Sequence, residues 1–237
     1  DLLKERAKKS IKTIVLPETE DMRTLEATDK ILKEGVAKII LIGNEEEINK
    51  KAAEGGFDIS GATIVDPETS DKTQAYIDKF VELRAKKGMT PEKAKEILHT
   101  QYPYYGVMMV KMGDADGMVS GACHSTADTL RPCLQILKTK PGTKLVSAFF
   151  LMVVPNCEYG ANGAFVFADS GLNQNPTPEE LSAIAASSAE SFELLVQEKP
   201  IVAMLSHSTK GSAKHADVDK VVEATKIAKE NAPEGLL

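Results

Sequence analysis

The segment TIVLPETEDMRTLEATDKILKEGVAKIILI, residues 13–42, decides the fold class of this chain. A short β-rich run at 13–16 is followed by a helical pattern at 22–33 and by a second apolar run at 38–42. The alternation continues outward, with a strand expected at 63–65 and helices expected at 45–53 and 72–86. Strands that alternate with helices predict βαβ units and a parallel sheet, so we expect an α/β fold.

The pattern of apolar runs and loops in the sequence changes near Pro141-Gly142. Before it, Pro91 suits the first position of a helix, and further patterns predict helices at 91–98 and 104–112 and a strand at 117–120. After it, apolar runs joined by loops rich in Gly, Asn and Ser predict buried strands. These runs cover residues 146–154, 164–168 and 201–205. We therefore expect two parallel-sheet α/β/α domains, 1–141 and 142–237, with an interdomain cleft.

Two helices are expected in the second half. Thr177-Pro178-Glu179-Glu180 has the pattern of a capping box and opens a helix that runs to about residue 197. A last helix is expected at about 217–230, and residues 1–12 are interpreted as an amphipathic entry helix.

Composition narrows the class of function. The formal net charge of −6 gives no general attraction to nucleic acid or to anionic membranes. The longest apolar run, residues 145–154, is far shorter than the about 20 residues that a membrane span requires. Residues 1–12 lack the apolar core of a secretory signal. A cytoplasmic protein that acts on small molecules is expected.

The three cysteines, Cys123, Cys133 and Cys157, are interpreted as reduced thiols. No CxxC pair or Cys/His grouping with zinc spacing occurs, so no metal site is expected. The sequence also has no GxGxxG or P-loop pattern, which gives no support to a nicotinamide cofactor or to ATPase chemistry.

The segment 120–131, SGACHSTADTLR, is the first candidate site. Backbone N–H groups, the hydroxyls of Ser125, Thr126 and Thr129, and the guanidinium of Arg131 are suited to hold a phosphate. An alternative interpretation is that the hydroxyls only cap a helix and Arg131 makes a surface ion pair. The segment alone does not separate the two.

Arg84 is the second candidate, because helical spacing places it at the border of an apolar face, where a cation needs an anion. The alternative is a side chain that extends its charged end into solvent. The acidic residues Glu18, Glu20 and Asp21 stand at a helix start, where their negative charges are interpreted as stabilising the helix dipole.

Two further candidates follow predicted strands of the second half. Ser208, Thr209 and Lys210 lie in a loop after the run 201–205, where ligand clefts of parallel sheets form. Cys157 follows the most apolar strand, either as a nucleophile or as an inert thiol near a ligand.

Seven segments, in this order along the chain, resemble the phosphate acetyltransferase family. They are residues 16–20 (LPETE), 80–88 (FVELRAKKG), 116–121 (DGMVSG), 129–132 (TLRP), 147–150 (SAFF), 167–171 (FADSG) and 206–213 (SHSTKGSA).

This resemblance implies a homodimeric enzyme that reversibly converts acetyl-CoA and phosphate to acetyl phosphate and CoA, with no bound cofactor and no metal in the chemistry. It implies that Arg84 and Arg131 bind CoA and that residues 125–129 lie beside the acetyl phosphate. Cys157 matches a cysteine near the active site that is not required as the nucleophile. Direct attack of the CoA thiolate in a ternary complex is the implied mechanism.

The resemblance also implies a further segment beyond the equivalent of Leu237, which completes the first domain and carries a Ser-Arg pair and an aspartate base. The catalytic residues are therefore expected outside these 237 residues. A phosphotransbutyrylase-like acyltransferase and a non-catalytic acetyl-CoA-binding module remain alternatives. A decarboxylating dehydrogenase of related architecture is a third alternative with less support, since no metal-binding carboxylate cluster is apparent.

Overall fold

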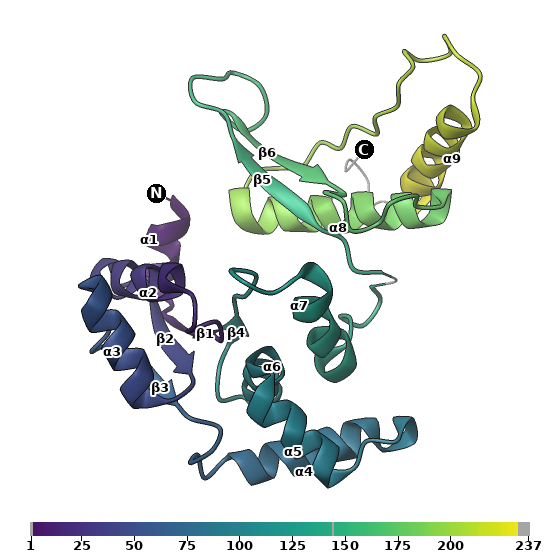
Figure 1. Cartoon of the computed structure of the whole chain (residues 1–237). Coiled ribbons are helices and arrows are strands. Elements are labelled where there is room, and N and C mark those ends of the chain that lie inside the picture. Colours follow the sequence, from purple (N-terminus) through teal and green to yellow (C-terminus); the bar gives the residue numbers. More distant parts are fainter. Residues whose placement is uncertain (1, 144, 232–237) are drawn as a thin grey trace. The chain divides into compact units, whose positions relative to one another are not determined.

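Residues 2–143 and 145–231 are described by the structure, a computed structural model, and the chain divides into two units, 1–138 and 139–237 (Figure 1). The boundary predicted after residue 141 lies close to this division. That each unit is an independent domain, and that a cleft lies between them, stays a prediction.

The first unit is built on a four-stranded parallel sheet. Its strands have the order β3-β2-β1-β4, and β1 pairs in parallel with both β2 and β4. Their bounds are β1 Lys12–Leu16, β2 Ala37–Ile42, β3 Thr63–Val65 and β4 Gly117–Met118. The α/β class and the parallel sheet predicted from the alternation of patterns are confirmed.

Helices connect these strands, and their ends follow local capping rules. Asn44 and Thr90 each accept a backbone N–H at the start of a helix, and Gly35 and Gly56 end helices in the left-handed conformation. The helices are α1 Leu2–Lys9, α2 Met22–Glu34, α3 Glu45–Gly55, α4 Thr73–Arg84, α5 Pro91–Thr100, α6 Tyr102–Met112 and α7 Thr126–Pro132. Short turns follow two of them: η1, Ala85–Lys87, and the π-helical η2, Cys133–Leu137.

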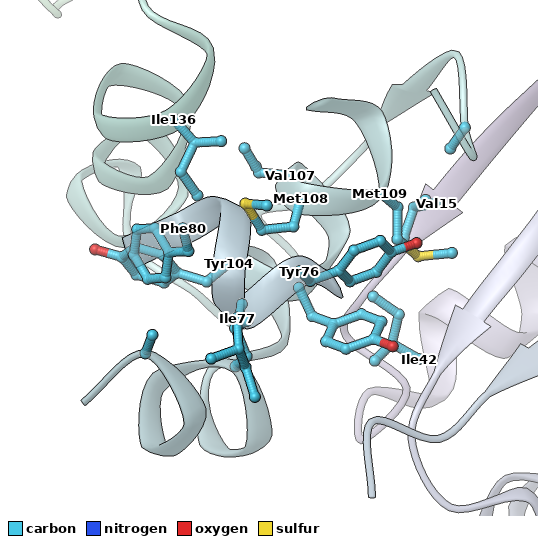
Figure 2. Packing of buried hydrophobic residues seen from close by; sticks show 14 of the residues in the cluster. Val15, Ile42, Tyr76, Ile77, Phe80, Tyr104, Val107, Met108, Met109 and Ile136 are labelled. Atoms are coloured by element: carbon cyan, nitrogen blue, oxygen red, sulfur yellow. The ribbon is translucent and has the colours of Figure 1, made fainter. Parts of the chain in front are cut away.

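The sheet is covered on both faces because alternate strand residues point to opposite sides. Leu16 and Leu41 pack with residues of α2 and α3 in one apolar cluster. Val15, Ile40 and Ile42 belong to a second cluster with residues of α4, α5 and α6, shown in Figure 2. The first unit is therefore the expected α/β/α sandwich.

The second unit has a two-stranded sheet, in which β5 (Phe149–Val153) and β6 (Ala164–Ala168) run antiparallel. Helices α8 (Pro178–Val196) and α9 (Ala216–Asn231) pack on each other, and α8 also packs on β6. The parallel sheet predicted for this half is wrong for β5 and β6. Their connection, residues 154–163, contains no helix, and a parallel pair needs a longer crossover.

The strand predicted at 201–205 is not present. Residues 201–206 have no regular secondary structure, and Ile201 and Leu205 are 91% and 82% exposed. A groove of about 660 Å³ lies between this segment, β6 and α8. An apolar run becomes a buried strand only where a neighbouring strand accepts its backbone hydrogen bonds, and no described residue does so here.

The two helices predicted in this half are confirmed. Thr177 accepts the N–H of Glu180, and the Glu180 side chain accepts the N–H of Thr177, so the capping box is complete. None of the helices in the described ranges combines the length and apolar character that a membrane span requires.

Candidate functional site

Glu18 fixes the loop that leads from β4 into α7. Its side chain follows β1, is only 2% exposed, and accepts hydrogen bonds from four consecutive backbone N–H groups of residues 121–124 at 2.7–2.9 Å. The ring Nδ1 of His124 lies at 2.9 Å from the same carboxylate. One buried carboxylate therefore holds together two segments that are more than 100 residues apart in the sequence.

The hydrogen bonds decide the ionisation of Glu18. Burial works to raise its pKa, but the N–H groups of Cys123, Ala122 and Gly121 and the ring of His124 together bring the pKa well below the ordinary value. Glu18 is therefore ionised at neutral pH. The interpretation that Glu18 stabilises the dipole of a helix start is wrong, because Glu18 accepts from the N–H groups of the loop and not from those of α2.

Ser125 is the N-cap of α7, as one of the two interpretations of the segment predicted. Its hydroxyl accepts the N–H of Asp128 and donates to the Asp128 carboxylate at 2.6 Å. This hydrogen bond, aided by the Arg131 charge, lowers the pKa of Asp128. Arg131 pairs with Asp128 at 3.2 Å and is exposed, so the surface ion pair of the same interpretation is also present. Thr126 is exposed as the first residue of α7.

Two other hydroxyls in this segment are buried without a partner in the described part of the chain. They are Oγ of Ser120 and Oγ1 of Thr129. A buried hydroxyl without a partner costs about 1–3 kcal/mol. These two oxygens are therefore available to a bound ligand that brings its own acceptors or donors.

Arg84 lies at the end of α4 in a strongly basic pocket. Its Nε is buried and has no hydrogen-bond partner within residues 2–143 or 145–231. The pocket has a volume of about 280 Å³, and its lining includes the cations of Lys87 and Lys93 together with the single anion of Glu96. An excess of positive charge around an unsatisfied guanidinium N–H is the arrangement that binds phosphate groups.

The positive charges of Arg84 and Arg131 both act on the hydroxyl of Tyr104. Burial raises the pKa of the Tyr104 hydroxyl, and the positive charges of Arg131 and Arg84 both act against this shift. The hydroxyl donates to Gln135 at 3.3 Å, and the ring packs against Phe80 of α4. The fold of the first unit therefore brings the two predicted arginines, 47 residues apart (131 − 84), to the surroundings of one tyrosine.

Comparison with known proteins assigns the chain to a protein family. The sequence profile of the family described as phosphate acetyl/butaryl transferase matches residues 1–237. The chain belongs to this family. A phosphate acetyltransferase of Acetivibrio thermocellus is 58% identical over 229 residues, which are 97% of this chain and 68% of that protein. One from Clostridium acetobutylicum is 51% identical over 230 residues, 97% of this chain and 69% of that protein.

Comparison with a solved structure supports the same family assignment. The phosphotransacetylase of Streptococcus pyogenes superimposes with a TM-score of 0.88 at 43% identity, covering 99% of this chain and 69% of that chain. The resemblance inferred from the seven sequence segments is therefore confirmed.

The other family-related residues lie in the second unit. Ser208, Thr209 and Lys210 are in the loop before α9, where the Ser208 and Thr209 hydroxyls bond to Ser212 at 3.0 and 2.7 Å. Lys210 is exposed and forms no ion pair with a described residue. Cys157 lies in the β5–β6 loop, with its sulfur 3.9 Å from the carbonyl of Tyr159. Contact of these residues with substrate stays a prediction.

Sequence reasoning missed several residues of the site. Lys87 and Lys93 join Arg84 only because the chain turns through η1 into α5, although the run Lys86-Lys87-Gly88 was a usable signal. Burial and a hydrogen bond to Glu20 raise the pKa of the Cys123 thiol to about 12. The grouping of Cys123 and His124 with Glu18 was invisible to a search for zinc spacing, because it joins two distant segments.

Proposed function

We propose that this protein is a phosphate acetyltransferase, which reversibly transfers an acetyl group between CoA and inorganic phosphate. The observation that carries this conclusion is the match to phosphate acetyltransferases at up to 58% identity across 97% of the chain. The basic pocket around Arg84, whose Nε has no partner among the described residues, supports it, because CoA is a polyphosphorylated substrate. The matched relatives are acetyltransferases, which favours acetyl over butyryl as the group transferred.

The residues of this chain have distinct proposed tasks. Arg84, with Lys87 and Lys93, holds phosphate groups of CoA, and Arg131 contributes a further cation, which also acts on the Tyr104 hydroxyl. The hydroxyls of Ser125, Thr126 and Thr129 contact acetyl phosphate. From the second unit, Ser208, Thr209 and Lys210 contribute contacts to substrate, and Cys157 lies near the site without acting as the nucleophile.

The proposed reaction is a direct transfer. In the direction of acetyl-CoA synthesis, the CoA thiol gives up its proton, which ends on the released phosphate or in solvent, and its sulfur bonds to the acetyl carbonyl carbon. The bond from that carbon to the phosphate oxygen breaks, and phosphate leaves with the electron pair. Fixed cations near the two phosphorylated substrates lower the barrier by stabilising the charge that develops on the departing phosphate.

The assay is the release of free thiol from acetyl-CoA on addition of inorganic phosphate. We expect release that requires phosphate, with one acetyl phosphate formed per thiol and slower release from butyryl-CoA. Binding of acetyl-CoA without thiol release would instead favour a non-catalytic binding module. A homodimeric assembly and a cytoplasmic location stay predictions from the family, and size-exclusion chromatography with light scattering tests the first.

A further inference from the structure

We propose that Glu18, Cys123 and His124 form a binding site for a zinc-type divalent metal ion, with Glu20 as a fourth ligand that moves toward them on binding. The candidate donor atoms of Glu18, Cys123 and His124 all lie within 4.8 Å of one another. Sγ of Cys123 is also 3.2 Å from Oε1 of Glu20. A thiol, an imidazole and two carboxylates are the ligand types that proteins use to hold Zn²⁺.

The distances among Glu18, Cys123 and His124 are close to those of three ligands in a tetrahedral site. Zinc bonds of about 2.3 Å to sulfur and about 2.0–2.1 Å to nitrogen or oxygen separate neighbouring ligand atoms by about 3.4–3.6 Å. Sγ of Cys123 lies 3.6 Å from Nδ1 of His124 and 3.5 Å from Oε1 of Glu18. Nδ1 of His124 lies 2.9 Å from the same Oε1. An ion requires that last pair to separate by only about half an ångström, whereas the Glu20 carboxylate lies outside the group of mutually close donor atoms and must move further to reach the ion.

The hydrogen bonding of Glu18 concerns the same cluster. Its Oε1 lies within hydrogen-bonding distance of four donor groups: the backbone N–H groups of Cys123 and His124, the imidazole, and the thiol, whose single proton is shared with the nearer Glu20. A carboxylate oxygen has about two lone-pair positions, so four donors crowd it. On metal binding the Cys123 thiol releases its proton to solvent and the His124 ring carries its proton on Nε2, so Sγ and Nδ1 each offer a lone pair to the ion in place of a proton to Oε1.

The surroundings also suit a cation. The backbone bonds to Glu18 hold the loop 121–124 in position before any ion arrives, so little ordering is required on binding. The charges near the cluster include Asp21 and Arg23, which pair with each other at 2.6 Å, and Asp128, which pairs with Arg131; Arg23 also donates to the carbonyl of Ala122. Glu18 and Glu20 therefore leave a net negative charge at the site.

The ligand set selects the class of metal. A thiolate and an imidazole favour Zn²⁺ and Co²⁺, whereas Mg²⁺ and Ca²⁺ prefer sites made only of oxygen. The proposal does not depend on acyl transfer, since metal binding is measured without any substrate.

The test is a titration of the metal-free protein with Zn²⁺ by calorimetry and with Co²⁺ by absorption. We expect one equivalent of Zn²⁺ to bind, and Co²⁺ to give a sulfur-to-cobalt charge-transfer band. Cys123→Ala and Glu20→Gln are both expected to weaken binding at least about ten-fold, and Cys123→Ala to abolish the band. Both residues are exposed, so these variants should fold.

Cys157→Ala is the matched control, because it removes a thiol from the second unit and leaves the proposed ligands intact. It is expected to bind Zn²⁺ as the unmodified protein does. The proposal is overturned if the unmodified protein binds no stoichiometric Zn²⁺, if Cys123→Ala binds it equally well, or if the cobalt band depends on Cys157 instead.

Discussion

Glu18 accepts two hydrogen bonds from His124, one from the backbone N–H and one from ring Nδ1, both at 2.9 Å. Through this pair the end of β1 is fastened to the loop that precedes α7. The residues predicted to contact acetyl phosphate begin directly after it, at Ser125. The position of that part of the site therefore depends on a carboxylate that itself need not touch substrate.

Replacement of Glu18 by Gln is expected to lower the free energy of unfolding by about 2–3 kcal/mol. Each carboxylate oxygen accepts from two of the four loop N–H groups, so the amide nitrogen of Gln faces two N–H donors that then have no acceptor. Urea unfolding of the metal-free protein measures the change. Glu26→Gln is the control, because Glu26 makes only an exposed ion pair with Lys30, and its stability should match that of the unmodified protein.

Glu18 also predicts an acid dependence of stability. Its pKa is lower in the folded protein than the ordinary value of 4.5, so the unfolded chain binds the proton more readily. The stabilisation is complete above the ordinary pKa and is lost as the pH falls below it toward the folded pKa. The difference in unfolding free energy between the unmodified protein and Glu18→Gln should therefore shrink steadily below about pH 4.5. A difference that stays constant or grows over that range contradicts the assignment.

Thr129→Val tests whether a buried hydroxyl is kept for ligand binding. Oγ1 has no partner in the described structure, so its loss removes no hydrogen bond and should leave the stability unchanged or slightly higher. The KM for phosphate or acetyl phosphate should rise, because the proposed contact is lost. Unfolding curves and steady-state kinetics are measured on the same preparation. A less stable variant with unchanged kinetics would show that the hydroxyl is structural.

Thr177→Ala is expected to destabilise the second unit by about 1 kcal/mol, because it removes the side-chain acceptor of the capping box of α8. Thr177→Ser keeps that acceptor and should behave as the unmodified protein. Thermal unfolding followed by circular dichroism compares the three. Equal midpoints for Ala and Ser would mean that the cap contributes nothing.

Much of the first unit was predictable because local signals and tertiary packing agree. The continuous apolar runs of β1 and β2, and caps such as Thr90, specify the same elements that the two covered faces of the sheet require. In the second unit the apolar run 201–205 reads as a buried strand, yet its state depends on a neighbouring strand that local sequence cannot supply.

The residues of the site also divide into those that local sequence predicts and those that depend on contacts between distant segments. Arg84 was predictable from helical spacing, because an arginine at an apolar border needs a partner anion. The pairing of Glu18 with residues 121–124 was not, since it depends on β1 and β4 being neighbours in the sheet. Such contacts between distant segments leave no periodic pattern in the sequence.

The most direct test of the proposed site is calorimetric titration of CoA into the protein, Arg84→Ala and Lys79→Ala. Lys79 lies on the same helix as Arg84 but pairs with Glu82, so its variant controls for the general loss of one positive charge. We expect Arg84→Ala to weaken CoA binding at least about ten-fold, the loss of a charge-assisted hydrogen bond, and Lys79→Ala to leave it unchanged. Equal CoA affinity in all three proteins would contradict the assignment of the basic pocket to CoA.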